Sequence, residues 1–246
     1  MSKIRNPFVL TSTNYGPMIV NRWDYRQYHD GFFGGVGINL LQTSSYCDDE
    51  IAVCLKLIDR RHTEFGTGVK ILDLGANIGS FTIPMAKHVT GWGDILAIEA
   101  QTPMYYALCG NITLNNCWNV RAIRAIIAEK ADQAMEMPMV DLFKPANFGG
   151  LSVDPKMNAD FDHITGSEST PTTSIDRIGM ERLDFIKIDI EGMEIDALKG
   201  GIETIKRCKP IIFLEHAFTT KEILLDTVPG YNFVDFNGGD AIMAPK

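Results

Sequence analysis

A glycine-rich turn preceded by an aspartate is the segment of this chain with the clearest chemical meaning. Residues 69–82 read Val-Lys-Ile-Leu-Asp-Leu-Gly-Ala-Asn-Ile-Gly-Ser-Phe-Thr. The apolar first half predicts a buried parallel strand, and Gly75 and Gly79 allow a tight turn into the start of a helix. Backbone N–H groups at such a helix start face a ligand. We therefore expect a nucleotide-type pocket here, with Asp73 deciding which nucleotide it accepts.

The carboxylate of Asp73 favours a cationic ligand over a phosphate. A dinucleotide fingerprint directs N–H groups at a pyrophosphate, which an acid two residues before the first glycine would repel, and the glycine spacing differs from G-x-G-x-x-G. S-Adenosylmethionine has no phosphate, so Asp73 would bind its ammonium group and the turn N–H groups its carboxylate. The residues expected to contact this cofactor at the turn are Asp73, Gly75, Ala76, Asn77, Gly79, Ser80 and Phe81.

A second acid, Glu99, ends the next predicted strand, residues 93–99. An acid at the end of the second strand is placed to accept hydrogen bonds from both ribose hydroxyls of a nucleotide. Taken alone, such a glutamate could equally be a solvated loop residue or a charge at a helix N-terminus. Its position after the Asp73 turn favours the ribose interpretation.

Ionisable residues gather at the ends of two later apolar strands. Residues 183–189 contain Lys187 and end at Asp189, Glu191 follows closely, and the next strand is followed by His216. Ligands of open α/β sheets lie at the carboxyl ends of strands, and ionisable groups in apolar surroundings are costly unless they are paired. We expect all four residues in a catalytic site. The alternatives are a structural ion pair of Lys187 with an acid and a hydrogen-bonded loop histidine.

An alcohol must lose its proton to become a good nucleophile, so methyl transfer to a hydroxyl requires a base. Glu191 and His216 are the first candidates for that role, and Asp189 would contact the cofactor amino group or the substrate. Asp189, Glu191 and His216 also offer an alternative interpretation as an oxygen-rich Mg²⁺ site that orients a diol. We favour a site without a metal.

Strands and helices alternate through most of the chain. We expect an α/β, Rossmann-like class I methyltransferase fold, with a mostly parallel seven-stranded sheet, an antiparallel C-terminal hairpin and helices on both faces. The predicted strands are residues 69–74, 93–99, 120–127, 183–189 and 210–215, with a hairpin at 231–236 and 240–244. The predicted helices are residues 48–61, 80–88, 102–115 and 220–227, one that ends near Gly200 and one that ends near Arg207.

Two regions depart from this alternation. Residues 1–45 are predicted to form an extension of short strands and loops, including a hairpin of 8–11 with 18–21, before a domain of residues 46–246. This extension either covers the active site or packs as surface structure. Two further strands are expected at 134–140 and 171–176. The polar region between them, residues 141–170, is expected to be a loop that acts as a lid on the substrate side.

Composition limits the classes of function. The chain has 246 residues, 45% of them hydrophobic, which is enough for one α/β core. The net charge of −8 argues against a sequence-independent nucleic-acid binder. No apolar run is long enough to span a bilayer and the first residues lack a signal-peptide core, so we expect a cytoplasmic protein without a membrane partner. The five cysteines contain no C-x-x-C pair and are expected to be buried thiols.

Several motifs resemble the FkbM-type methyltransferases. The matching segments are Leu72–Thr82, Ile98–Ala100, Gly149–Ser152, Thr173–Asp176 and Asp184–Glu194. The first motif is common to class I methyltransferases, whereas Lys-Ile-Asp-Ile-Glu-Gly-Met-Glu in the last is much more specific. The resemblance implies S-adenosylmethionine as the cofactor and a hydroxyl of a sugar, polyketide or other natural product as the acceptor. It also implies that adenine lies near Ala100, Ala125 and Ile126.

The favoured function is therefore an S-adenosylmethionine-dependent O-methyltransferase that acts on a small molecule, such as a sugar or natural-product moiety. A nicotinamide-dependent oxidoreductase is a second enzyme hypothesis, which Asp73 and the glycine spacing oppose. A binding module that keeps the pocket without turnover is a third hypothesis, which the ionisable residues after the fourth strand oppose.

Overall fold

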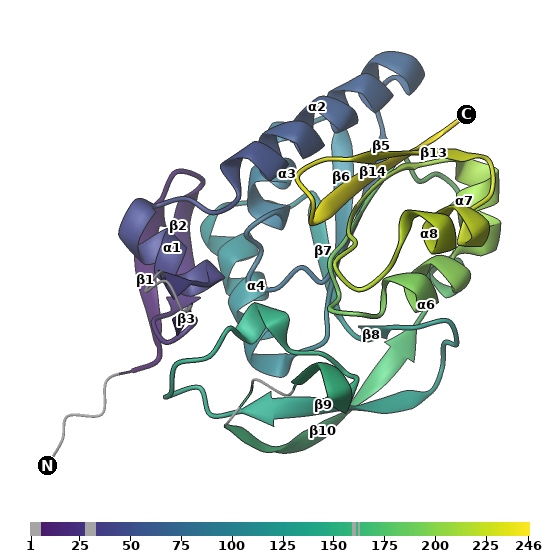
Figure 1. Ribbon diagram of the computed structural model, residues 1–246. Helices are drawn as coiled ribbons and strands as arrows, with labels where there is room; N and C mark the ends of the chain where they lie inside the picture. Colours follow the sequence, from purple (N-terminus) through teal and green to yellow (C-terminus); the bar gives the residue numbers. More distant parts are fainter. Residues whose placement is uncertain (1–5, 28–32, 159–160, 162) are drawn as a thin grey trace, which may run out of the picture.

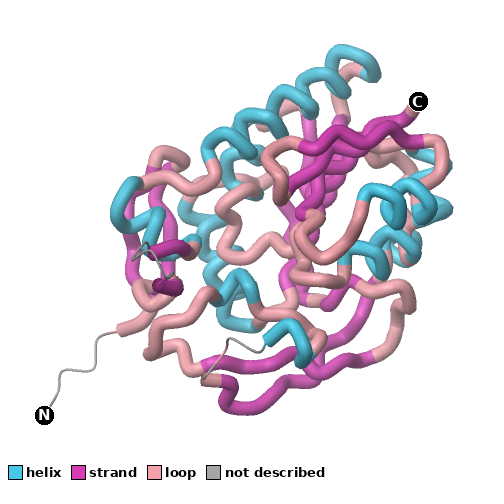
Figure 2. The backbone as a smooth tube through the Cα atoms, viewed as in Figure 1, coloured by secondary structure: helices cyan, strands magenta, loops and turns pink. Residues whose placement is uncertain are grey.

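A central sheet of seven strands organises the molecule. The computed structural model describes residues 6–27, 33–158, 161 and 163–246. The strand order is β13-β14-β12-β11-β5-β6-β7, and Figures 1 and 2 show helices on both sides of it. The strands are β5 (Val69–Leu74), β6 (Gly93–Glu99), β7 (Val120–Arg124), β11 (Phe185–Ile188), β12 (Ile211–Glu215), β13 (Tyr231–Asp235) and β14 (Asp240–Pro245). Only β14 runs antiparallel to its neighbours within this sheet of described residues. This is the predicted class I methyltransferase fold.

The helices follow the strands closely, as the alternating pattern predicts. They are α1 (Val36–Thr43), α2 (Asp48–Phe65), α3 (Thr82–His88), α4 (Thr102–Leu114), α5 (Ile175–Ile178), α6 (Glu194–Lys199), α7 (Ile202–Cys208) and α8 (Lys221–Thr227). Local chemistry fixes several of the helix starts. The Thr220 hydroxyl caps α8 by accepting the Ile223 N–H. Three acids occupy the first turn of α2, where their negative charge interacts favourably with the helix dipole.

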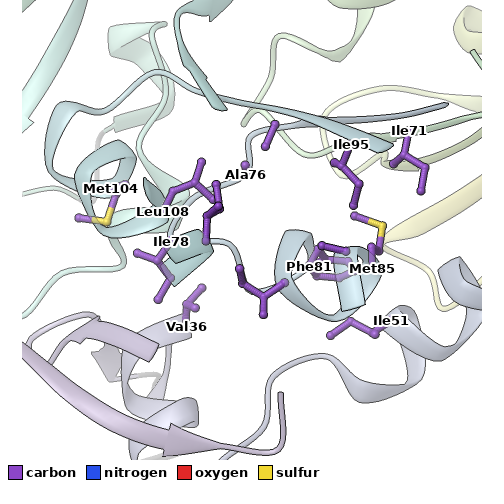
Figure 3. Packing of buried hydrophobic residues seen from close by; sticks show 14 of the residues in the cluster. Val36, Ile51, Ile71, Ala76, Ile78, Phe81, Met85, Ile95, Met104 and Leu108 are labelled. Atoms are coloured by element: carbon purple, nitrogen blue, oxygen red, sulfur yellow. The ribbon is translucent and has the colours of Figure 1, made fainter. Parts of the chain in front are cut away.

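Alternate residues of the central strands pack into two separate hydrophobic clusters. In β5, Val69 and Ile71 belong to the cluster that contains α1 to α4, whereas Leu72 and Leu74 belong to the cluster that contains α6 to α8. Figure 3 shows part of the first cluster. Because side chains alternate along a strand, Asp73 must point to the same side as Val69 and Ile71. The fold therefore directs this acid towards α3.

The N-terminal segment packs against the first of these clusters. The predicted hairpin is confirmed as β1 (Phe8–Thr13) paired with β2 (Gly16–Asn21), and Met18 and Val20 are fully buried. A second pair, β3 (Arg26–Gln27) and β4 (Phe33–Gly34), leads into α1. Sequence analysis missed α1 because its surroundings are rich in glycine. Residues 28–32 of the predicted irregular stretch lie outside the described residues.

Two predictions for the middle of the chain are wrong. The third strand ends at Arg124, and β8 (Ile126–Ile127) pairs instead with β10 (Ile164–Thr173), which also pairs with β9 (Ala134–Val140). The predicted loop therefore ends at residue 163, and α5 replaces the end of the strand expected at 171–176. Most of β10 is exposed, so it lacks the apolar alternation that would have revealed it. Residues 159, 160 and 162 of the expected lid lie outside the described residues.

No described helix combines the length and the hydropathy needed to cross a bilayer. All five cysteines are free thiols. The expectation of buried thiols is confirmed for Cys54 and Cys117 and is wrong for Cys47, Cys109 and Cys208, which are partly exposed.

Candidate functional site

A cavity lies at the edge of the sheet where the parallel strands end. The turn after β5, the ends of β6, β11 and β12, and the short helix η1 (Phe148–Gly150) contribute to its walls. Ligands of open α/β sheets bind at this edge. The predicted site residues that line the cavity are Gly75, Asn77, Ser80, Phe81, Glu99, Ala100, Ala125, Ile126, Lys187, Asp189 and Glu191.

The glycine-rich turn brings β5 very close to the end of β11. Gly75 has φ +77°, and a Cβ atom there would lie 1.7 Å from the carbonyl oxygen of Asp189. Only glycine combines this backbone conformation with so close an approach. Asn77 adopts the left-handed conformation at φ +49°, and Gly79 has φ +93°. Gly75 therefore lets two strand ends approach each other. The expected N–H donors of the turn are already paired, because Gly75 and Ala76 donate to the Ile98 carbonyl and Gly79 donates to the Ala76 carbonyl. Ala76 and Gly79 are not among the described residues that line the cavity.

Glu99 is held rigidly at the end of β6. The backbone N–H of Asn77 donates to its Oε2 at 2.8 Å and that of Gln101 donates to its Oε1 at 2.7 Å. The residue is only 5% exposed. Burial raises the pKa of the carboxyl to about 7, although these N–H donors oppose the increase. Glu99 is thus a fixed acceptor on the cavity wall, where the sequence predicts a contact with ribose.

Asp73 is not among the described residues that line the cavity. It is completely buried, and its Oδ2 accepts a hydrogen bond of 2.6 Å from the Thr82 hydroxyl of α3. Burial raises its pKa, whereas Lys187 and Thr82 lower it. Within the described residues, Oδ1 has no hydrogen-bond partner. The structure therefore places this acid beside Lys187 in the core, and the expected direct contact with an ammonium group has no support from its position.

Lys187 connects this buried acid to the cavity. Its Nζ lies 3.0 Å from Oδ2 of Asp189 and 4.7 Å from the ring centroid of Phe81. Burial alone would lower the pKa of Lys187, but Asp189 and Asp73 together raise it, so the side chain carries a positive charge. The predicted placement of Lys187 and Asp189 on one side of the strand is confirmed.

Three carboxylates meet beside this lysine. Asp189, Glu191 and Glu215 each place one oxygen within 4.8 Å of the others. Burial and the neighbouring acids raise the pKa of Glu191 to about 9 and that of Glu215 to about 8. One lysine cannot neutralise three carboxylates, so this part of the cavity either holds protons or attracts a cation. Such a set of oxygens is also of the kind that binds Mg²⁺.

The backbone around Glu191 is held in an uncommon conformation. Glu191 has φ +51° and Gly192 has φ +94°. The Ser152 hydroxyl donates to the Glu191 carbonyl at 2.6 Å, and the Gly192 N–H donates to Oε1 of Glu194 at 3.1 Å. Ser152 and Glu194 are both buried. Left-handed non-glycine residues persist when their surroundings enforce them, and they cluster at functional sites.

His216 does not join the carboxylates. It is not among the described residues that line the cavity. Its ring packs edge-on against Phe233 at 5.6 Å, and its Nε2 lies 3.6 Å from Oδ2 of Asp235. The strand-end position of His216 is as expected, but its side chain contacts β13. The sequence predicts a cluster of Asp189, Glu191 and His216. In the structure, Glu215 takes the place of His216 in this cluster.

Sequence reasoning also missed several polar residues of the cavity wall. Glu215 was identifiable as the last residue of β12, because it ends at the same edge as Asp189. Tyr46, Gln101 and Asn147 lie in connecting segments that no motif marks. All four of these residues line the cavity.

Comparisons with known proteins agree with this geometry. The family model described as the methyltransferase FkbM domain matches residues 73–234. A relative, the methyltransferase sdnD of Sordaria araneosa, is 28% identical over 159 residues, which cover 53% of this chain and 59% of sdnD. The chain thus matches less than two thirds of that relative's length.

Two solved structures are similar to this chain. Monomeric WbdD has a TM-score of 0.53 at 11% identity, covering 86% of this chain and 44% of that one. A methyltransferase FkbM from Methylobacillus flagellatus KT has a TM-score of 0.49 at 18% identity, covering 84% and 58%. The likeness to WbdD supports the fold alone. The family match spans most of the chain, including the glycine-rich turn and the carboxylate cluster, and the protein therefore belongs to the FkbM family of methyltransferases.

Proposed function

We propose that this chain transfers the methyl group of S-adenosylmethionine to a hydroxyl of a small molecule. The observation that carries the proposal is the charge of the cavity. Asp189, Glu191 and Glu215 bring three carboxylates together beside one lysine. S-Adenosylmethionine is cationic at its sulfur and at its amino group, so this surplus of acids matches its charge.

The residues present fit this donor. Oε2 of Glu215 is buried and has no hydrogen-bond partner among the described residues, which is costly in the absence of a ligand. Glu99 offers a fixed carboxylate on the opposite wall for ribose hydroxyls. When bound, the donor supplies an electrophilic methyl group on a sulfonium, which is a good leaving group.

Glu191 is the residue best placed to act as the base. It lines the cavity at the turn after β11, and the raised pKa of about 9 makes its carboxylate a good proton acceptor. A cation bound nearby lowers this pKa and favours the charged form at neutral pH. In its charged form the carboxylate would take the proton of the acceptor hydroxyl, as the hydroxyl oxygen bonds to the methyl carbon and the methyl–sulfur bond breaks with its electron pair left on sulfur. His216 is not among the described residues that line the cavity, and its ring packs against Phe233 of β13, so it is less well placed for this role.

The cavity also discriminates against dinucleotides. A pyrophosphate at the glycine-rich turn would lie close to the carboxylates of Asp189 and Glu215, with only Lys187 to offset them. Like charges in a site of low polarity repel strongly. We therefore expect nicotinamide dinucleotides to bind much more weakly than S-adenosylmethionine.

Calorimetry and a transfer assay test the proposal together. We expect S-adenosylmethionine and S-adenosylhomocysteine to bind, NAD to show no measurable binding, and labelled methyl groups to pass to small molecules of a cell extract. Glu99→Gln should weaken donor binding, whereas Glu203→Gln on the exposed surface should not. Donor binding without any transfer would identify a binding module, and NAD binding alone would overturn the proposal.

A further inference from the structure

A second cavity adjoins the first, and polar and apolar side chains both line it. Its volume is about 750 Å³, within the range typical of sites for small organic ligands. Glu191 and Asn147 line both cavities. The two spaces therefore adjoin at the residue to which we assign the role of base.

Aromatic rings supply much of the apolar lining of this cavity, beside the polar side chains of Arg26, Gln27 and His163. Phe33 of β4 is 39% exposed and Phe218, which follows β12, is 49% exposed. Tyr25 packs edge-on against Phe33 with ring centroids 5.5 Å apart, and Phe161 and Met157 extend the apolar surface. Exposed aromatic rings from segments far apart in sequence, gathered around one hollow, indicate an apolar ligand group.

The N-terminal segment that carries two of these rings is anchored to the first cavity. Asp24 is buried; its Oδ2 accepts the Gly37 N–H at 2.9 Å and its Oδ1 accepts the Phe148 N–H at 3.0 Å. The Phe148 carbonyl accepts a hydrogen bond of 2.7 Å from Gln101 Nε2. Gln101 in turn donates its backbone N–H to Glu99. A series of hydrogen bonds through Gln101 and Phe148 therefore connects Glu99 of the first cavity to Asp24, which directly precedes Tyr25.

From this arrangement we propose that the second cavity binds the methyl acceptor, and that the acceptor is amphipathic. Its hydroxyl-bearing end lies beside Glu191 and Asn147, and an apolar ring or chain lies between Phe33 and Phe218. A glycoside with a hydrophobic aglycone has this chemistry. The inference rests on the proposed function, since it requires Glu191 to receive the proton of the acceptor. It also assigns part of the acceptor specificity to Tyr25 and Phe33, which precede the matched family region, and part to Phe218, which lies within it.

Two probes that share one sugar test the proposal. Phenyl β-D-glucopyranoside and methyl β-D-glucopyranoside differ only in the apolar group, so their affinities report on the aromatic wall. In calorimetric titrations of the full chain saturated with S-adenosylhomocysteine, we expect the phenyl glycoside to bind at least about tenfold more tightly. Phe33→Ala and Phe218→Ala should each reduce this preference to less than about threefold.

Phe65→Ala is the matched control. Phe65 is 50% exposed, but it ends α2 near the opposite edge of the sheet, so its loss should leave the preference unchanged. Equal affinities for the two probes, an unchanged preference in both cavity variants, or no binding of the phenyl glycoside would overturn the inference. Titration of the same proteins without S-adenosylhomocysteine, using S-adenosylmethionine as the ligand, separates this outcome from failure of the proposed function, which would abolish donor binding as well.

Discussion

The position of Glu191 concentrates several unusual properties in one residue. Its backbone is left-handed, its carboxyl has a raised pKa, and it lines both cavities. Ser152 and Glu194 hold the backbone from both sides. A flexible loop would let this side chain turn to water. The buried supports keep it instead at the junction of the two cavities, where the proposed reaction needs a base.

Replacing this carboxylate should separate chemistry from donor binding. In Glu191→Gln the shape of the side chain is kept but its basicity is lost, so kcat should fall by about two to four orders of magnitude. The Kd for S-adenosylmethionine should change by less than about tenfold, because two acids of the cluster remain. Transfer of labelled methyl and calorimetry measure the two effects. A variant with normal kcat would remove Glu191 as the base; Glu203→Gln is the control.

Donor affinity should rise with pH. Ligand-free Glu99, Glu215 and Glu191 have pKa values raised by burial to about 7, 8 and 9. A cationic ligand binds their charged forms better, so binding releases protons and tightens as pH increases. Between about pH 6.5 and 8.5 we expect roughly a tenfold gain. S-Adenosylhomocysteine lacks the sulfonium charge and should gain less, so equal pH profiles for both ligands would argue against the cluster facing the sulfur.

At the scale of elements, the anchoring of the N-terminal segment depends on Asp24. Both oxygens of its buried carboxylate accept backbone N–H groups, one from α1 and one from η1. An asparagine has one acceptor oxygen, so Asp24→Asn leaves a buried N–H group unpaired. We expect the free energy of unfolding to drop by about 1–3 kcal/mol in urea titrations.

Asp132→Asn provides the matched control for this prediction. Asp132 pairs with Arg177 at 2.8 Å, but its side chain is 70% exposed. Exposed ion pairs contribute little to stability. If both variants lost the same stability, the buried hydrogen bonds of Asp24 would not be the cause.

Local sequence patterns predict some of the strands, helices and site residues and not others. The bounds of β5, β6 and β9 were predicted to the residue, because apolar or alternating runs end at clear turn signals. Only residues 171–173 of the exposed strand β10 were predicted, and the glycine-flanked α1 was missed, since long-range pairing and tertiary packing stabilise both elements. In the site, strand ends located Asp189 and Glu99. The direction of the His216 side chain depends on contacts with β13, which no local pattern encodes.

At the scale of the whole molecule, the acids of the site impose a cost on the ligand-free fold. The folded-state pKa values of Asp24, Glu99, Glu215 and Glu191 all lie above their ordinary values. At pH values between the ordinary pKa values and the raised ones, the folded chain therefore binds more protons than the unfolded chain. Stability linked to these groups is present below the ordinary pKa values and is lost as pH rises through the raised ones.

We therefore expect the urea midpoint of the ligand-free protein to decrease from about pH 6 to about pH 9. Saturating S-adenosylmethionine should reduce this decrease, because the cation offsets the uncompensated carboxylates. Combining Glu191→Gln with Glu215→Gln should flatten the profile without ligand. A midpoint that increased over this range would show that other groups control the pH dependence.

The aromatic wall of the second cavity has a practical consequence for engineering. It is built largely by β3, β4 and connecting segments, whereas the donor site is built by strand ends that also hold the sheet together. Glu191 and Asn147 line both cavities, but Tyr25 and Phe33 line the second cavity and not the first. A chimera that receives the first 45 residues of another family member should accept different hydroxyl compounds while keeping its use of the methyl donor.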